Sequence, residues 1–165
     1  MGLKHEAKRI QEVPESWNRI TGEILGAAIE VHRELGPGLL ERLYEQALCH
    51  ELTLRGVRFE RQHPIRLSFK GVQLGEQLLD LVVENLVVVE LKSVERVHDT
   101  HISQLMSYMR SSSLPLGLLV NFNVARLKEG IYRRVLTADT PVPSAMLEQL
   151  PPLRDSALPA NSAVS

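Results

Sequence analysis

Leu78-Leu79-Asp80-Leu81-Val82-Val83 is followed, after a short turn, by Leu86-Val87-Val88-Val89-Glu90-Leu91-Lys92, and these two stretches decide the fold. Both are rich in branched apolar residues, which is typical of buried strands, and the turn near Glu84-Asn85 predicts a hairpin. A buried acid is costly unless it is paired, protonated or bound to a metal ion. The two acids therefore predict a site for a hard cation, which prefers oxygen ligands, with a lysine beside it.

The face of the sheet on which Asp80 lies depends on the length of this turn. Side chains alternate along a strand, so Glu90 and Lys92 share one face. A two-residue turn would place Asp80 opposite Val89 and separate the two acids, whereas a three-residue loop through Leu86, or a bulge, would place Asp80 opposite Glu90. The metal-site hypothesis requires the second register.

The composition predicts a single domain that is soluble and cytoplasmic. A chain of 165 residues can bury a core without disulfides, and its single cysteine, Cys49, excludes an internal disulfide. With 19 basic and 20 acidic residues the chain lacks the global positive field of a nonspecific nucleic-acid coat protein, so any polyanion site must be local. No stretch approaches the roughly 20 apolar residues that span a membrane, and the charged N-terminus is unlike a secretory leader.

Three parts are expected along the chain. Residues 1–16 are polar and predict an N-terminal arm, and residues 17–136 carry the periodic apolar patterns of a folded domain. Residues 137–165 are rich in proline, serine and alanine and poor in large apolar residues, which predicts a disordered tail.

The periodicities predict an α/β fold with an N-terminal helical hairpin and a central mixed β-sheet. One helix is expected from Asn18, as its cap, to Gly36-Pro37-Gly38, and a second from about Leu39 to Arg55. A strand, a helix and a further strand then form a right-handed β-α-β crossover with parallel strands. The expected strands are 58–62, 65–69, 78–83, 86–92, 116–122 and an edge strand at 130–136, with the crossover helix at 99–111.

Two carboxylates beside a lysine suit the hydrolysis of a phosphodiester with a divalent metal. Asp80 and Glu90 would hold Mg²⁺, which takes one or two carboxylates and keeps several waters, while Lys92 would polarise the attacking water or neutralise charge on the phosphate. Glu41 precedes Tyr44 by three residues, beside the apolar stripe of its helix, and could supply a third ligand. The alternative for the two strand acids is a structural ion pair of Lys92 with either of them. The alternative for Glu41 is a glutamate at the edge of the core that bonds a neighbouring arginine.

Polar residues on the crossover helix could complete the site. Gln104 and Tyr108 lie one helical turn apart and would point at the strand ends, where crossover folds tend to bind ligands. Their alternative is ordinary surface or capping chemistry. His98 and His101 suggest a two-histidine metal site, which the lack of further nearby histidines or cysteines disfavours.

Several short motifs follow one another in order from about residue 20 to residue 135. They read Gly38-Leu39-Leu40-Glu41-Arg42-Leu43-Tyr44, Ile20-Thr21-Gly22, Ala28-Ile29-Glu30-Val31-His32, Leu35-Gly36-Pro37-Gly38, Val89-Glu90-Leu91-Lys92, Gln104-Leu105-Met106-Ser107-Tyr108 and Gly117-Leu118-Leu119-Val120-Asn121-Phe122. In these motifs the chain resembles the GxxExxY family, small and mostly bacterial proteins of the PD-(D/E)XK nuclease-like superfamily.

The resemblance implies a restriction-endonuclease-like core and gives roles to individual residues. The implied site residues are Glu41, Asp80 and Glu90 as ligands of Mg²⁺ or Mn²⁺, Lys92 as the activating cation, Gln104 as a positioning group and Tyr108 as a possible substrate contact. The chain departs from the family at Leu78, where members often carry an arginine, and so lacks one possible phosphate contact.

Two functions of different classes follow. The first is a divalent-metal-dependent nuclease that hydrolyses phosphodiester bonds, with DNA as the expected partner. The second is a non-cutting module that keeps the nuclease fold and binds a protein or nucleic acid, and a homodimer is open in either case. A doubly wound nucleotide-binding enzyme is disfavoured because the chain has no glycine-rich turn from strand to helix.

Overall fold

The computed structural model describes residues 13–137, so residues 1–12 of the predicted arm and residues 138–165 of the predicted tail lie outside the described residues. The elements, in chain order, are α1 (Glu15–Leu35), α2 (Glu41–Leu54), β1 (Phe59–Phe69), β2 (Val72–Val83), β3 (Val87–Lys92), α3 (Asp99–Ser112), β4 (Leu116–Asn121), the 3-10 helix η1 (Leu127–Gly130) and β5 (Ile131–Val135). The predicted α/β class, with a helical hairpin before a mixed sheet, is confirmed.

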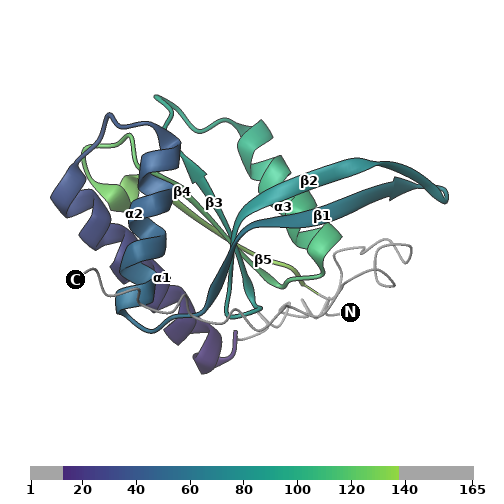
Figure 1. Ribbon diagram of the computed structural model, residues 1–165, viewed down its shortest axis with the longest axis horizontal. Coiled ribbons are helices and arrows are strands. Elements are labelled where there is room, and N and C mark those ends of the chain that lie inside the picture. The colour runs from purple at the N-terminus through teal and green to yellow at the C-terminus, as the bar shows by residue number, and fades with distance from the viewer. Residues whose placement is uncertain (1–12, 138–165) are drawn as a thin grey trace, which may run out of the picture.

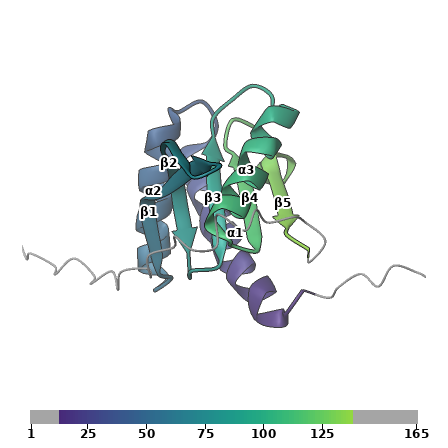
Figure 2. The same ribbon diagram turned by 90° about the vertical axis from the view of Figure 1, so that its right-hand side faces the viewer.

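The five strands form one sheet in the order β1-β2-β3-β4-β5, in which β3 and β4 are parallel and the other neighbouring pairs are antiparallel. Helices α1 and α2 cover one face and α3 covers the other, as Figures 1 and 2 show. All of β4 and nearly all of β3 are buried because both faces are covered, which explains their continuous apolar sequences. No helix within residues 13–137 is long and apolar enough to cross a membrane.

Helix α1 begins earlier than the sequence predicts. It starts at Glu15 with Pro14 in the cap position, where the fixed φ of proline is acceptable and its missing N–H costs nothing. The Pro14 carbonyl accepts hydrogen bonds from the N–H groups of Trp17 and Asn18. The side chain of Asn18 instead accepts a hydrogen bond from Arg133 of β5, at 3.0 Å. The prediction that Asn18 caps this helix is therefore wrong.

Strand β1 is one long strand rather than the two short ones that the sequence predicts. Its ladder with β2 has an irregular position at Gln62, whose φ of 51° lies in the left-handed region. The neighbours of Gln62 pair normally, Arg61 with Leu81 and His63 with Leu79. The irregular position therefore lies opposite Asp80.

The loop between β2 and β3 fixes the register on which the metal-site hypothesis depends. Val83 pairs with Val87, so the loop contains three residues, and the pairing continues to Leu81. Extending this register by one more residue places Asp80 opposite Glu90. The register that the hypothesis requires is the one that the structure has.

Candidate active site

Strand β3 places Glu90 and Lys92 on the face that α3 covers. Their side chains form an ion pair, with 3.0 Å between Lys92 Nζ and Glu90 Oε1. Glu90 is only 4% exposed, and its second oxygen, Oε2, is buried without a hydrogen-bond partner in the described part of the chain. One carboxylate oxygen is thus paired while the other lacks a partner.

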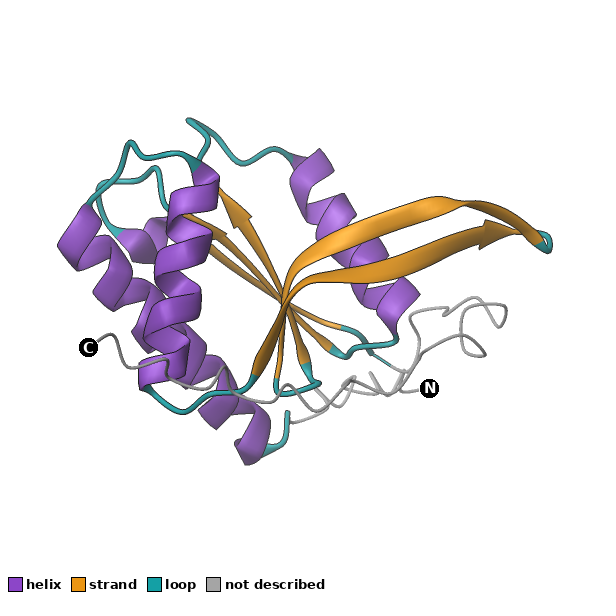
Figure 3. Cartoon of the chain, viewed as in Figure 1, coloured by secondary structure: helices purple, strands orange, loops and turns teal. Residues whose placement is uncertain are grey.

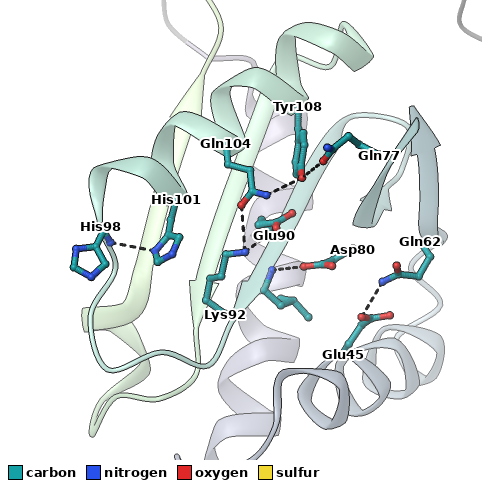
Figure 4. A network of polar contacts seen from close by, with 11 residues as sticks. Glu45, Gln62, Gln77, Asp80, Glu90, Lys92, His98, His101, Gln104 and Tyr108 are labelled. Atoms are coloured by element: carbon teal, nitrogen blue, oxygen red, sulfur yellow. Dashed lines mark hydrogen bonds and ion pairs between the residues drawn. The ribbon is translucent and has the colours of Figure 1, made fainter. Parts of the chain in front are cut away.

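Strand β2 brings Asp80 to the same place. The ladder between β2 and β3 stops at Leu81, and just beyond it the N–H of Leu91 donates a hydrogen bond to Asp80 Oδ2 at 2.8 Å. Where the two strands separate, the Leu91 N–H is therefore hydrogen-bonded to a side-chain oxygen of β2 instead of to a backbone carbonyl. Figure 4 shows Asp80 beside Glu90 and Lys92 at this point.

Helix α3 contributes a chain of hydrogen bonds that ends on Lys92. Gln104 Oε1 accepts from Lys92 Nζ at 3.3 Å, and Gln104 Nε2 donates to the Tyr108 hydroxyl at 2.8 Å. The Tyr108 hydroxyl in turn donates to Gln77 Oε1 of β2 at 2.8 Å, so β2, α3 and β3 are linked across the site (Figure 4). Sequence reasoning placed Gln104 and Tyr108 here but missed Gln77.

Glu41 stands at the first position of α2 and acts on the site through its charge. That charge raises the pKa of both Asp80 and Glu90. Among the described residues, however, no group of three or more histidine, cysteine, aspartate or glutamate side chains is arranged to hold a metal ion. The structure thus pairs Asp80 with Glu90, without Glu41 completing a three-acid cluster.

Glu45, one turn after Glu41 on α2, was missed by the sequence analysis. It is buried, forms an ion pair with Arg61 and accepts a hydrogen bond from Gln62 Nε2 at 3.0 Å. Its charge also raises the pKa of Asp80. The i, i+4 spacing from Glu41 is the signal that could have found it, because such residues share a helix face.

Hydrogen bonds between His98 and His101 close the start of α3. The His98 N–H donates to His101 Nδ1 at 3.1 Å, and the His101 N–H donates to the His98 carbonyl at 3.0 Å. Burial, followed by the charge of Lys92, lowers the pKa of His101. A shallow cavity of about 700 Å³ adjoins these rings and is lined by Val94, Glu95, Arg96, His98 and His101. The geometry thus gives the His101 ring a role in capping the helix.

The charges of the site are unevenly compensated. Burial raises the pKa of Asp80 to about 6, although the hydrogen bond from Leu91 lowers it. Burial, followed by the charge of Asp80, raises the pKa of Glu90 to about 7. Burial lowers the pKa of Lys92, but the charges of Glu90, Glu41 and Asp80 and the hydrogen bond to Glu90 outweigh it, so the net shift is upward. One ammonium thus faces two acids, Asp80 and Glu90, whose charged forms are disfavoured.

These residues fit a hard divalent cation such as Mg²⁺ or Mn²⁺. Buried polar atoms in proteins normally have a partner, and Glu90 Oε2 has none in the described residues. A cation between Glu90 and Asp80 would supply that partner and offset the second negative charge, and carboxylate oxygens are the ligands that such ions prefer. Lys92 alone provides a single positive charge for both acids.

Comparison with known proteins identifies a family. The model of the PD-(D/E)XK nuclease superfamily matches residues 18–135, which include all the elements from α2 to β5 and nearly all of α1. Searches of curated proteins and of solved structures found no match to this chain. The narrower resemblance to the GxxExxY family stays a prediction.

Proposed function

Because the chain belongs to the PD-(D/E)XK nuclease superfamily, we propose that it is a divalent-metal-dependent nuclease that hydrolyses phosphodiester bonds in DNA. The observation that supports this most strongly is the pairing of Asp80 with Glu90 where β2 and β3 separate, with an unpartnered buried oxygen on Glu90 and the Lys92 ammonium beside it. Carboxylates and a cation in this arrangement suit phosphoryl chemistry.

Asp80 and Glu90 would hold Mg²⁺ or Mn²⁺, and Glu41 would act on the ion through its charge or through a bridging water. When bound, such an ion stabilises negative charge on a phosphate and lowers the pKa of water. The two carboxylates must be deprotonated to hold it, and their raised pKa values place that deprotonation near neutral pH.

Lys92 acts as a cation rather than as a base. Its raised pKa keeps the ammonium protonated at neutral pH, so it cannot accept a proton from water. It can instead stabilise the negative charge that develops on the phosphate oxygens. Gln104 is a positioning residue: because its amide nitrogen is held by Tyr108, its oxygen is turned toward the ammonium.

A non-cutting module is the second candidate, and the ion pair between Lys92 and Glu90 favours it. At 3.0 Å and largely out of solvent, this pair could serve structure alone. The two candidates differ in one respect that can be measured, because a structural pair does not make cleavage depend on a divalent ion.

The test is cleavage of supercoiled plasmid, linear duplex, single-stranded DNA and RNA with Mg²⁺, with Mn²⁺ and with a chelator. We expect cleavage of DNA that needs the ion and that falls by about a hundredfold or more in Asp80→Asn, Glu90→Gln and Lys92→Ala. Glu129→Gln, an exposed acid on η1, is the matched control and should cut like the native chain.

Lys92→Ala leaves Glu90 buried without its partner, so circular dichroism must show that this variant is folded before its rate is compared. Equal rates in the native chain and in folded Glu90→Gln would contradict the proposed mechanism. Retention of a nucleic acid without any cleavage would favour the non-cutting module.

A further inference from the structure

Strand β2 changes the face to which its side chains point at Asp80. Side chains alternate along a strand, so Leu79 and Leu81 should lie on the same face. In the structure, Leu81 is buried in the cluster that contains Tyr44 of α2, whereas Leu79 is buried in the cluster that contains Leu105 of α3. Because α2 and α3 cover opposite faces of the sheet, the regular alternation breaks at the residue between the two leucines. That residue is Asp80.

Strand β1 loses its alternation at the same level. Arg61 and Gln62 are neighbours in the chain, and regular alternation would point their side chains to opposite faces. Both nevertheless bind Glu45 of α2. Arg61 forms an ion pair with Glu45 Oε1, and Gln62 Nε2 donates a hydrogen bond of 3.0 Å to Glu45 Oε2. Since Gln62 stands opposite Asp80 in the ladder, the two strands depart from regular geometry at one facing pair of positions.

The backbone of Gln62 has a conformation that its side chain disfavours. Its φ of 51° lies in the left-handed region, which glycine, asparagine and aspartate enter far more readily than other residues. Such conformations persist only where surrounding contacts enforce them, and they are concentrated at functional sites. Glu45 supplies the contact here, because it is only 6% exposed and its second oxygen holds the Gln62 amide.

The break coincides with an unusual direction of the Asp80 carboxylate. In a regular strand this side chain would project from a face of the sheet. Instead, Asp80 Oδ2 accepts the Leu91 N–H at 2.8 Å, and strand N–H groups point along the sheet toward the neighbouring strand. The carboxylate is thus directed toward β3, where Glu90 lies (Figure 4). Beyond this point β2 pairs with β1 alone, and the two strands leave the sheet together (Figure 3).

We propose that Gln62 is a positioning residue of the candidate site: its left-handed backbone, held by the Glu45 side chain, turns β2 at Asp80 and so directs the Asp80 carboxylate toward β3. Gln62 acts through Asp80 and does not itself contact the ion or the substrate. The inference rests on the proposed function only in taking Asp80 as a metal ligand. Its geometric part can be tested without metal.

The Leu91 N–H reports the direction of Asp80 in the absence of metal. Hydrogen exchange followed by NMR, with a chelator present, measures how well this N–H is protected. The internal reference is the N–H of Val89, which lies on the same strand within the ladder to β2. A change in overall stability alters both exchange rates, so their ratio isolates the contact with Asp80. Asp80→Ala removes the acceptor and gives the ratio expected when the contact is lost.

Gln62→Val is the disruptive change, because a β-branched residue rarely adopts a left-handed conformation. Relative to Val89, the Leu91 N–H of this variant should exchange faster by about tenfold or more. Gln62→Asn tolerates the conformation and keeps an amide, so it should restore most of the protection. Lys70→Val is the matched control: Lys70 has a φ of 48° in the turn between β1 and β2, so valine meets the same strain at the tip of the hairpin. Its exchange ratio should equal that of the native chain.

Titration with Mn²⁺ extends the test to the site. Gln62→Val should bind Mn²⁺ about tenfold or more weakly than the native chain, while Lys70→Val should bind like the native chain. If Gln62→Val does not fold, Gln62→Gly takes its place. Glycine accepts the left-handed backbone but lacks the amide that Glu45 holds, so its Leu91 N–H should also exchange faster than in the native chain.

A native exchange ratio in the folded variant, Gln62→Val or Gln62→Gly, would overturn the proposal, whether or not the chain binds metal or cleaves DNA. Native affinity for Mn²⁺ in a variant whose Leu91 N–H has lost its protection would also overturn it. A native chain that does not bind Mn²⁺ would instead contradict the proposed function, and the exchange ratios would still decide whether Gln62 positions Asp80.

Discussion

Glu90 is the residue at which folding and the proposed chemistry make opposite demands. Its side chain is nearly inaccessible, one oxygen is paired with Lys92, and the other has no partner in the described residues. Burial and the nearby charge of Asp80 raise its pKa to about 7, so folding favours the protonated acid. Holding a cation requires the carboxylate. We infer that a bound cation would offset the cost of burying the charged form of Glu90.

The conflict predicts how stability depends on pH in the absence of metal. The pKa values of Asp80 and Glu90 in the folded chain, about 6 and about 7, exceed their ordinary values of 3.8 and 4.5. The stability that the protonated acids contribute is therefore complete below about pH 4 and is lost as the pH rises through 6 and 7. The free energy of unfolding of Glu90→Gln, measured relative to that of the native chain, should therefore increase by about 1–3 kcal/mol between about pH 5 and pH 8.

Urea unfolding at the two pH values, with a chelator present, measures this difference. Glu129→Gln is the control, and its unfolding free energy should follow that of the native chain at both. If the Glu90→Gln and native values differed by the same amount at both pH values, the charge on Glu90 would not be disfavoured by the fold.

At the scale of the element, the loop between α1 and α2 positions Glu41. Gly38 has a φ of 101°, in the region that favours glycine. The Tyr44 hydroxyl donates to the Gly36 carbonyl and accepts from the Leu39 N–H at 3.1 Å. The Tyr44 ring also stacks on Phe122, with 4.4 Å between ring centroids. The glycine and tyrosine of the motif thus fix the start of the helix that carries its glutamate.

A second contact ties this loop to the site. Ser93, which follows Lys92 directly, donates a hydrogen bond from its hydroxyl to the Leu39 carbonyl at 2.6 Å. The end of β3 and the start of α2 are therefore held together by one side chain, so movement of the loop would change the distance between Glu41 and Lys92.

Tyr44→Phe should keep the stacked ring and remove both hydrogen bonds of the hydroxyl. We expect a loss of about 1–2 kcal/mol in the free energy of unfolding and a slower cleavage rate, because the position of Glu41 is no longer fixed. Urea unfolding and a plasmid cleavage assay measure the two effects, with Tyr132→Phe on β5 as the control. A variant as stable as the native chain would show that the hydroxyl does not hold the loop.

The sequence predicts the elements whose burial is uniform, and β3 is the clearest of them. Asp80 could be placed opposite Glu90 only conditionally, because the register depends on whether the turn includes Leu86, and no local pattern decides this. The first part of β2, which includes Val72 and Leu74, is exposed and gives no strand signal, since it is a strand only through its pairing with β1. Pairing across the chain is not visible in local periodicity.

The site residues that the sequence missed were missed for a related reason. Gln77 is an ordinary polar residue until β2 is placed beside α3, where it meets Tyr108. Glu45 is likewise defined by Arg61 and Gln62 of a different element. Acids within apolar stretches can be recognised from the sequence by themselves. Residues whose role depends on a partner from another element can be recognised only once the tertiary structure is known.

At the scale of the whole molecule, the candidate site lies at the carboxyl end of β3, the strand that leads into the crossover helix α3. Folds with parallel strands often bind ligands at this end. Here β2 separates from β3 at the same point and continues outward paired with β1 alone (Figure 3). One departure from regular pairing thus places the candidate site at the base of the β1–β2 extension.

The central claim is that Asp80 and Glu90 hold a divalent cation beside Lys92, and calorimetric titration with Mn²⁺ and Mg²⁺ at about pH 8, where both acids are ionised, tests it most directly. We predict binding to the native chain and to Glu129→Gln, with affinity about a hundredfold weaker or lost in Asp80→Asn and in Glu90→Gln. Equal binding by the native chain and by both folded site variants would contradict the claim.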